Sequence, residues 1–391
     1  MTTSNAELAP TRHSLPLPMG AQSAKGLLPL DVQLWFEVLA LIILGLVMIY
    51  SSSFVMAFQK TGDAAHYVKR QFLWIVLGLA TMITVSRIHY SRYKSYARLI
   101  LLASLASLAL VAVPGIGVKF NNARRWIGFG GLNLQPAEFA KVAWIIFLSS
   151  SLAAKQERIK KIAVGFLPHM VWCGVFALLL LLEPDFGTTF MISLLTMVML
   201  FIGGVPLRQL IALAPLGLAG FYRFVYLVPY RWERITAFLN PWTDPLDSGY
   251  QLIQAWIAVG SGGLWGKGLG AGHQKLFYLP ESFTDFILAV VGEELGFVGI
   301  LAVCLLFFFL FWTGMQITHR ARDNHARMLA AGLTLLLSLQ ALLNIGVVLG
   351  LVPTKGMPLP FISYGGSAFI ANCVAVGILM NLAKNSDGQA D

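Results

Sequence analysis

Asp285 lies at the end of a polar segment, residues 278–286 (YLPESFTDF), which is followed directly by an apolar segment. Asp285 is therefore expected near the interface between a membrane helix and water. A carboxylate partly removed from water has a raised pKa and can act as a general base. The spacing from Ser282 to Asp285 also fits a capping box, in which Asp285 would only occupy the third helical position. Spacing alone leaves both interpretations open.

Two further carboxylates, Glu293 and Glu294, follow inside the apolar run itself. Charge is costly inside a membrane, so residues of this kind are usually paired, protonated or functional. The structural alternative is a pair of hydrogen bonds to a neighbouring helix.

Residues 122–141, NARRWIGFGGLNLQPAEFAK, combine two arginines with an acid–base pair. The planar guanidinium forks of Arg124 and Arg125 suit the oxygens of a diphosphate. Glu138 and Lys141 lie three positions apart and are neighbours on a helix, where their simplest role is mutual neutralisation.

Two other polar segments are rich in turn-forming residues. In residues 183–189, EPDFGTT, the structural interpretation is a helix cap in which Asp185 binds the following backbone amides. In residues 353–367, PTKGMPLPFISYGGS, Lys355 is able to neutralise a phosphate, and glycines near Ser363 would let backbone amides approach a ligand. A turn-rich loop with incidental polar side chains explains this second segment equally well.

The elements that must position these motifs are membrane helices. Of the 391 residues, 57% are hydrophobic and only 12% are charged, and the mean hydropathy is +0.72. A soluble chain of this size would carry roughly twice that charge. A helix needs ~20 apolar residues to cross the hydrocarbon core. The sequence thus predicts an all-α, polytopic integral membrane protein with about ten spans, near residues 33–54, 71–88, 96–114, 136–153, 162–182, 186–204, 207–226, 285–312, 327–350 and 362–382.

Lysine and arginine determine the predicted orientation. With the N-terminus inside, fifteen of the 28 positive residues fall in inner segments that contain few acids. This arrangement obeys the positive-inside rule, and an even number of spans places the C-terminus in the cytoplasm as well. The net charge of +10 therefore serves topology, and no nucleic-acid partner is expected. Positive residues in the outer loops, such as Lys267 and Lys275, are not required for topology.

Three parts of the chain are predicted. Residues 1–30 form a Pro-rich cytoplasmic tail that is expected to be disordered and lacks the apolar region of a cleavable signal. Residues 31–383 form the membrane domain, and residues 384–391 form a second cytoplasmic tail. Within the membrane domain, residues 227–284 make one large outer loop that is too long for a mere connector. Mixed charge, aromatic residues and glycine concentrate in the outer segments, so function is expected on that face.

Several strings resemble motifs of the SEDS family (shape, elongation, division and sporulation). They are NARRWIGFGGLNLQPAEFAK, EPDFGT, NPWTDPLDSGYQLIQAWIAVGSGGLWGKGLG, QKLFYLPESFTDFILAVVGEELGFVG and PTKGMPLPFISYGGSA. They occur in the order of the family, and the resemblance runs from about residue 30 to 383. QKLFYLPES and VGEELG resemble the division branch of the family more than its elongation branch.

The resemblance implies a peptidoglycan glycosyltransferase that polymerises lipid II on the outer face of the bacterial cytoplasmic (inner) membrane, at the division septum. The essential aspartate of the family matches Asp285, which favours a general base over a cap. Other positions that match family motifs, and for which substrate contacts are expected, are Arg125, Gln135, Glu138, Lys141, Asp185, Lys355 and Ser363. Glu183 matches the acidic turn of the family as well. Phe283 departs from the polar residue or His often found there, so that side chain is not expected to transfer protons.

The implied reaction is an inverting displacement. Asp285 would take the proton of the acceptor hydroxyl as it attacks the anomeric carbon of the donor, and undecaprenyl diphosphate would leave. Arg125, with Lys355 or an outer-loop arginine such as Arg231, would stabilise the leaving diphosphate. A divalent cation (Mg²⁺ or Mn²⁺) could share that task, but no ligand cluster is visible in the sequence.

Two other classes of function compete. A lipid II flippase would need the same apolar groove and would use the buried charges as a polar path, but it explains the large outer loop less well. A division scaffold would mainly hold partners at the septum. For any of these roles, the resemblance implies a complex with a class B penicillin-binding protein, a transpeptidase, and with other divisome membrane proteins.

Overall fold

The computed structural model describes residues 28–113, 115–120, 123–129 and 132–387. Most of the predicted N-terminal tail, residues 1–27, and the last four residues of the predicted C-terminal tail lie outside the described residues.

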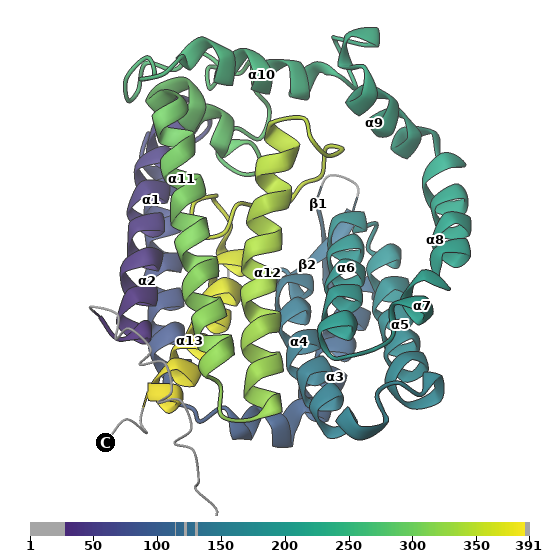
Figure 1. Cartoon of the computed structure of the whole chain (residues 1–391). Coiled ribbons are helices and arrows are strands. Elements are labelled where there is room, and N and C mark those ends of the chain that lie inside the picture. The colour runs from purple at the N-terminus through teal and green to yellow at the C-terminus, as the bar shows by residue number, and fades with distance from the viewer. Residues whose placement is uncertain (1–27, 114, 121–122, 130–131, 388–391) are drawn as a thin grey trace, which may run out of the picture.

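Long apolar helices make up most of the described chain (Figure 1). Within the described ranges, nine helical segments are long and apolar enough to cross a membrane, and the 17-residue α6 is a shorter tenth. The prediction of an all-α bundle with about ten spans is therefore confirmed. The helices are α1 (Leu30–Thr61), α2 (His66–Ser86), α3 (Ser91–Ala112), α4 (Pro136–Ala154), α5 (Leu167–Leu182), α6 (Phe186–Ile202), α7 (Leu207–Ile211), α8 (Ala214–Phe221), α11 (Ile287–Arg320), α12 (Asn324–Val348) and α13 (Gly366–Asp387).

The interior of the bundle is formed by α13, which packs against α1, α2, α4 and α12. Apolar side chains of α11, α12 and α13 contribute much of the main core. At the opposite extreme, residues 207–226 bury almost none of their side chains. This segment is the predicted seventh span, and it is divided into α7, α8 and a π-helical turn at Tyr222–Tyr226. Figure 1 shows α8 standing apart from the central helices.

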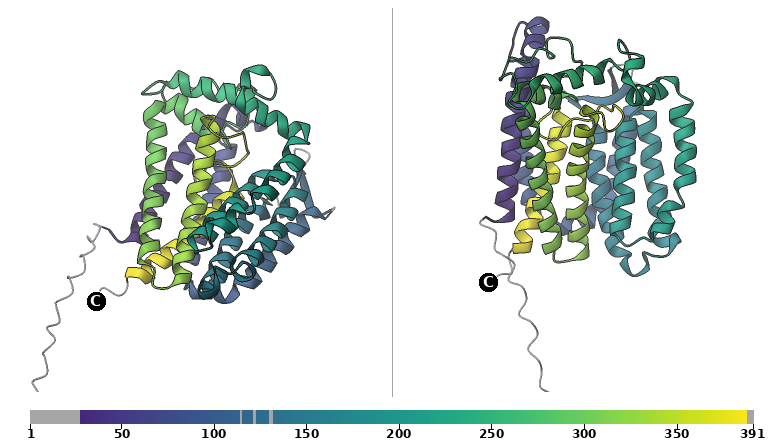
Figure 2. Two further views of the ribbon diagram at one scale, coloured as in Figure 1. Left: turned by 45° about the vertical axis from the view of Figure 1, so that its right-hand side comes forward. Right: turned by 45° about the horizontal axis from the view of Figure 1, so that its top comes forward.

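Both described ends of the chain lie at the same end of the bundle. Lys384, near the end of α13, places its Nζ 3.8 Å from Oδ2 of Asp31, in the first turn of α1. The opposite end, here named the loop end, carries residues 115–120, 123–129, 132–134, 227–286 and 349–365 (Figure 2). The same-end arrangement fits an even number of crossings, while the side of the membrane that each end faces stays a prediction.

A small antiparallel sheet at the loop end is an addition to the predicted all-α architecture. Its strands are β1 (Gly117–Phe120), β2 (Ala123–Phe129) and β3 (Leu132–Leu134), in the order β1-β2-β3. The predicted all-α fold assigned no strands to this segment, which lies between the predicted spans 96–114 and 136–153. Pro136 then starts α4 at a first-turn position, where its missing N–H costs nothing.

The predicted large loop, residues 227–284, contains two helices of its own. They are α9 (Pro229–Leu239) and α10 (Tyr250–Gly262), and they run across the loop end above the membrane helices (Figures 1 and 2). α10 packs against α11, so the loop is tied to the bundle at its C-terminal half.

α11 is interrupted one turn after its paired glutamates. Gly296 has φ 67°, in the left-handed region that favours glycine. A methyl group at this position would also lie 2.3 Å from a backbone nitrogen of the segment that follows α10. That segment fills the break, because the N–H groups of Lys267 and Gly268 donate to the carbonyls of residues 293 and 294 (3.0 Å each). The interruption therefore fixes the large loop to α11 through backbone hydrogen bonds.

Candidate active site

Asp285 lies in the turn that leads into α11, at the edge of a cavity of about 110 Å³. Four segments of the loop end meet there: α9, α10, the turn before α11 and the loop between α12 and α13. The cavity is lined by Arg234, Gln251, Glu281, Asp285, Phe286, Thr354, Lys355 and Gly356. Two predicted site residues from distant parts of the chain, Asp285 and Lys355, are thus brought to one space.

The capping-box interpretation of Ser282 and Asp285 is wrong. α11 begins at Ile287, so Asp285 precedes the helix instead of occupying its third position. The Ser282 side chain is buried, and its Oγ has no hydrogen-bond partner among the described residues. The carboxylate is therefore not used to start the helix.

The surroundings of Asp285 disfavour its charged form. Burial, and secondarily the negative charge of Glu281, raise the pKa of Asp285 from 3.8 to about 7, while Arg234 opposes the shift. A carboxyl group with such a pKa is partly ionised near neutral pH and is matched to accepting a proton. Its backbone carbonyl is held in place by Asn344, whose Nδ2 donates to it at 2.8 Å.

Lys355 lies across the same cavity, with its Nζ 3.4 Å from the centroid of the Phe190 ring. Burial lowers the pKa of Lys355 from 10.5 to about 8, and the nearby Asp185 carboxylate partly offsets this effect. The side chain is mostly charged at neutral pH, and it carries its charge in a partly desolvated place where an anion would be bound more strongly than in water.

Asp185 has the capping role predicted from its sequence. Its Oδ1 accepts from the backbone N–H of Thr188 (3.0 Å) and its Oδ2 from the hydroxyl of Thr188 (2.8 Å), at the start of α6. The negative charge of Asp185 also raises the pKa of Lys355. The acidic turn therefore interacts electrostatically with the loop between α12 and α13.

Glu183 and Arg125 lie at the same acidic turn. Burial, with a contribution from the neighbouring Asp185, raises the pKa of Glu183 to about 8. Arg125, on β2, does not bind this carboxylate but donates from its guanidinium to the backbone carbonyls of Glu183 (3.0 Å) and Pro184 (2.5 Å). The predicted diphosphate ligand is therefore occupied in holding the sheet against the turn.

Arg231, on α9, approaches the acidic turn from the other side. Its guanidinium carbon is 3.9 Å from the centroid of the Phe186 ring, and its Nη1 donates to the carbonyl of Phe224 (2.8 Å). Arg231 is outside the cavity lining, whereas Arg234, one turn further along α9, is part of it. Contact of Arg231 with a substrate diphosphate stays a prediction, and Arg234 is the arginine of α9 that lines this cavity.

Glu138 and Lys141 form the buried ion pair expected from their spacing, with Nζ and Oε2 2.8 Å apart. Lys141 also donates to Oε1 of Gln340 on α12 (3.3 Å). The Glu138 charge acts on Asp285 as a minor influence, so the pair lies close behind the cavity.

Gln135 and Ser363 do not line the cavity. The backbone N–H of Gln135 donates to the hydroxyl of Ser367 (2.9 Å), which joins the start of α4 to the start of α13. Ser363 is buried, and its Oγ accepts from the N–H of Leu359 (2.8 Å). Both residues join segments around the site, and contact of either side chain with a substrate stays a prediction.

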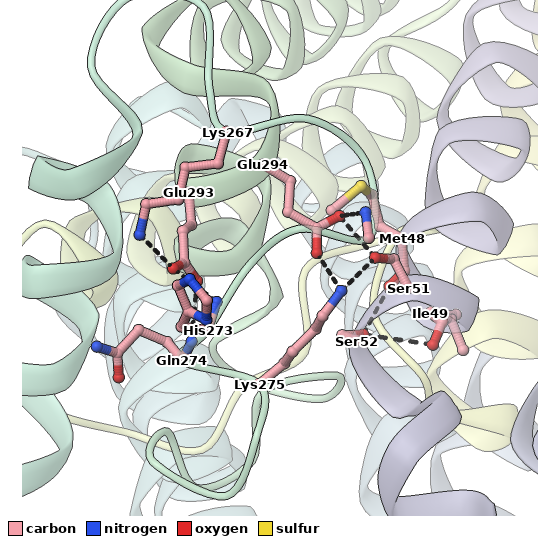
Figure 3. Close-up of polar contacts among 11 residues, drawn as sticks. Met48, Ile49, Ser51, Ser52, Lys267, His273, Gln274, Lys275, Glu293 and Glu294 are labelled. Atoms are coloured by element: carbon pink, nitrogen blue, oxygen red, sulfur yellow. Dashed lines mark hydrogen bonds and ion pairs between the residues drawn. The ribbon is translucent and has the colours of Figure 1, made fainter.

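Glu293 and Glu294 are both paired, and their partners come mainly from the large loop (Figure 3). Lys267 lies 2.9 Å from Glu293, and Lys275 lies 2.6 Å from Glu294. The hydroxyl of Ser51 on α1 also donates to Glu294 (2.6 Å). Lys267 and Lys275, which the positive-inside rule does not require, thus neutralise the two carboxylates of α11, whose charge would be costly inside a membrane.

Backbone groups complete this network. The N–H groups of His273 and Gln274 donate to Glu293 (2.8 and 3.1 Å), and that of Gly270 donates to Glu294 (3.0 Å) (Figure 3). The network fastens residues 267–275 to α11 and α1, directly before the turn that carries Asp285. The two glutamates therefore have a structural role: they hold this part of the large loop. The structural alternative predicted hydrogen bonds to a neighbouring helix, and α1 supplies one of them through Ser51, but most partners come from the loop.

Several cavity and support residues were missed by the sequence analysis. Arg234, Gln251 and Gly356 line the cavity, and Gln340 and Asn344 support it from α12. Only the last two left a signal, because two amides four positions apart lie in the mostly apolar C-terminal half of α12. Within the described ranges, no group of three His, Cys, Asp or Glu side chains converges as a metal site would require.

The chain is similar to known proteins over most of its length. Residues 32–388 match the model of the FtsW, RodA and SpoVE family, described as cell cycle protein. The chain is 45% identical over 358 residues to the probable peptidoglycan glycosyltransferase FtsW of Geobacter metallireducens, covering 92% of this chain and 96% of the relative. It is 41% identical over 356 residues to stage V sporulation protein E of Bacillus subtilis, covering 91% and 97%.

Solved structures show the same architecture. A chain of a peptidoglycan synthase complex, solved to describe the coordination of polymerization and crosslinking, superposes with a TM-score of 0.76 at 29% identity, covering 92% of this chain and 99% of the other. The rod shape determining protein RodA of Thermus thermophilus gives a TM-score of 0.67 at 27% identity, covering 90% and 96%.

Proposed function

The chain belongs to the FtsW, RodA and SpoVE family of cell cycle proteins, and on that premise we propose that Asp285 is the general base of its glycosyl transfer. This is the family predicted from the sequence motifs. The protein is a peptidoglycan glycosyltransferase, which is the activity in the names of relatives that are 44% and 45% identical over 92% of this chain.

The observation that carries the proposal is that Asp285 and Lys355 both line one cavity. A glycosyl transfer needs a base for the acceptor hydroxyl and a positive charge for the leaving diphosphate. Asp285, with a pKa of about 7, supplies the first, and Lys355, with a pKa of about 8, supplies the second. Both groups are in their active protonation states between these two values.

The proposed reaction joins two lipid II molecules. The acceptor hydroxyl oxygen forms a bond to the anomeric carbon of the donor, and its proton passes to the Asp285 carboxylate. The bond from that carbon to the diphosphate oxygen breaks, and undecaprenyl diphosphate leaves with the bonding electrons. A single displacement inverts the anomeric centre, so an α-linked lipid diphosphate becomes a β-linked glycan.

Lys355 is favoured over Arg125 as the main ligand of the diphosphate. Lys355 faces the cavity, whereas the Arg125 guanidinium is bonded to two backbone carbonyls. Arg234 is the second positive group of the cavity lining. A diphosphate placed between Lys355 and Arg234 would stand beside the Asp285 carboxylate.

The loop end is proposed to face the outside of the cytoplasmic (inner) membrane, at the division septum. Charge distribution supports this orientation, because the short loops at the end that holds both termini are rich in lysine and arginine. A similar chain lies in a peptidoglycan synthase complex that polymerises and crosslinks. We propose a class B penicillin-binding protein as the crosslinking partner here, with further divisome membrane proteins.

A lipid II flippase is supported less well. The buried charges that would make its polar path are engaged with one another: Glu138 with Lys141, Glu293 with Lys267, and Glu294 with Lys275. Glycan formation by the polymerase and movement of lipid II between leaflets without glycan formation are separate measurements.

The deciding experiment compares lipid II polymerisation by the wild type and by Asp285→Asn, each purified with its cognate transpeptidase. Asp247→Asn, in the large loop outside the cavity lining, is the matched control. We expect glycan strands from the wild type and the control and none from Asp285→Asn, with all three proteins folded and bound to the partner. Normal polymerisation by Asp285→Asn would remove the proposed base, and transport of lipid II without glycan from the wild type would favour the flippase.

A further inference from the structure

Two buried amide side chains lie one turn apart on α12, on its side towards the cavity. Gln340 and Asn344 are 0% and 1% exposed, within a helix whose other buried residues are mostly apolar. An amide buried away from water is costly unless its polar atoms find partners. The cost of burying these two amides is offset by hydrogen bonds to two loop segments and to Lys141.

Asn344 connects two loops that are far apart in the sequence. Its Nδ2 donates to the backbone carbonyl of Asp285 (2.8 Å) and to that of Met357 (2.7 Å). Its Oδ1 has no partner among the described residues, so the side chain is held by its two donor bonds. Both hydrogens of one amide group thus tie the turn of Asp285 to the loop that follows Lys355.

Gln340 extends the connection by one residue. Its Nε2 donates to the carbonyl of Pro358 (3.1 Å), while its Oε1 accepts from Lys141 (3.3 Å). Only this orientation of the amide gives the carbonyl a donor and the ammonium an acceptor. Lys141 is in turn fixed by Glu138 (2.8 Å), so the buried ion pair orients Gln340.

We propose that Gln340 and Asn344 are positioning residues that hold the loop of Lys355 and Gly356 against Asp285. The carbonyls that they bind, at positions 285, 357 and 358, belong to two of the four segments that line the cavity, the turn before α11 and the loop after α12. The inference rests on the proposed function, in which Asp285 and Lys355 act together. It also gives the Glu138–Lys141 pair a structural role. Lys141 orients the Gln340 amide, and that amide binds the carbonyl of Pro358 in the loop of Lys355.

The tolerance for misplacement is small. An atom added at Gly356 would meet the Asp285 carboxylate at 2.9 Å, so the loop already lies at contact distance. A loop released from α12 has no other described side chain bonding its carbonyls at Met357 and Pro358. Release is expected to move Lys355 relative to Asp285 without removing either chemical group.

The test is Asn344→Leu, which keeps the approximate size of the side chain and removes both bonds. The matched control is Asn381→Leu on α13, because Asn381 is also buried and also bonds two backbone groups, the carbonyl of Ser86 and the N–H of Tyr90, at the other end of the bundle. Asn344→Leu loses two hydrogen bonds and Asn381→Leu loses three, because Asn381 Oδ1 also accepts from Asn385 Nδ2 (3.2 Å). A general loss of stability would therefore appear in both variants.

We expect Asn344→Leu to lower kcat of lipid II polymerisation by about 10- to 100-fold, the cost of a misplacement of roughly 1 Å, with KM little changed. Asn381→Leu should keep kcat within about twofold, since it acts far from the reacting groups. Amide hydrogen exchange of residues 353–360 should speed up in Asn344→Leu and not in Asn381→Leu. Unchanged kcat, or unchanged exchange in that loop, overturns the proposal.

A second variant covers a failure of Asn344→Leu to fold. Gln340→Leu releases only the Pro358 carbonyl, and it should lower kcat and loosen the same loop by smaller amounts; a wild-type kcat with wild-type exchange contradicts the inference. Hydrogen exchange does not depend on catalysis, so the two proposals fail separately. Normal activity of Asp285→Asn would contradict the proposed function. The exchange rates of residues 353–360 would still show whether Gln340 and Asn344 hold that loop.

Discussion

The Asp285 carboxylate lies directly against Gly356, so that a methyl group at position 356 would fall 2.9 Å from Asp285 Oδ2. These residues are 71 positions apart in the sequence and come from the turn before α11 and the loop after α12. The contact brings Lys355, the neighbour of Gly356, to the same cavity. Glycine is required here by space, since its φ is not in the left-handed region.

Gly356→Ala is expected to lower polymerisation by at least about tenfold, because the new methyl group displaces either the carboxylate or the loop of Lys355. Gly365→Ala is the control in the same loop, where an added methyl group meets nothing closer than 3.9 Å. Initial rates of glycan formation measure both variants. Equal rates for the two would show that the contact at position 356 does not matter.

The pH dependence of polymerisation should have its acid limb near the pKa of Asp285, about 7. A general base works only when ionised, so the rate falls as pH drops through that value, by roughly tenfold per unit. The charged groups around Asp285 are Glu281, Arg234 and Glu138, with Lys355 across the cavity.

Charge variants at this cavity should move the acid limb in opposite directions. Glu281→Gln removes a negative neighbour and should shift the limb to lower pH, whereas Arg234→Gln removes a positive one and should shift it to higher pH. Rates measured from pH 5 to 9 give the shifts. A limb that stays in place in both variants would mean that Asp285 is not the group that titrates.

Glu183 should make the protein less stable as the pH rises. Its pKa in the folded protein, about 8, lies above the usual 4.5, so the folded state binds this proton more tightly than the unfolded state. Its contribution to the free energy of unfolding is complete below about pH 4.5 and is lost as the pH rises to about 8. Glu183→Gln, which is neutral at every pH, should raise the melting temperature at pH 9 by roughly 2–4 °C.

Thermal unfolding in detergent at pH 5 and pH 9 measures this difference. Glu233→Gln, at an exposed position of α9, serves as the control. A gain from Glu183→Gln that is the same at both pH values would contradict a protonated Glu183.

The buried pair of Lys275 and Glu294 should respond asymmetrically to mutation. Lys275→Met leaves the Glu294 carboxylate without its cation in a buried place, at a cost of about 3–5 kcal/mol in the free energy of unfolding. Adding Glu294→Gln to this variant should recover part of the loss, since no uncompensated charge remains. Lys69→Met breaks an exposed pair with Asp63 and should cost at most about 1 kcal/mol.

Denaturation of the three variants in one detergent tests the argument. If the double variant is less stable than Lys275→Met by the full cost of a second independent mutation, the two side chains are not coupled and the network of Figure 3 does not hold the loop.

The sequence by itself determined the membrane helices, because a span depends on the apolar character of ~20 consecutive residues. It also predicted the family, since the motifs are contiguous strings, and the Glu138–Lys141 pair and the Asp185 cap, since both lie within one helical turn. These are local relationships that spacing reveals.

Only the tertiary structure decided between alternatives that involve distant partners. Whether Asp285 caps a helix or faces a cavity depends on Lys355 and Asn344, which lie 70 and 59 positions away. The two glutamates of α11 form ion pairs with lysines of the large loop, and the hydroxyl of Ser363 accepts a hydrogen bond from Leu359 within its own loop. Such contacts arise from the packing of whole helices, and no local pattern of residue types records which side chains that packing will bring together.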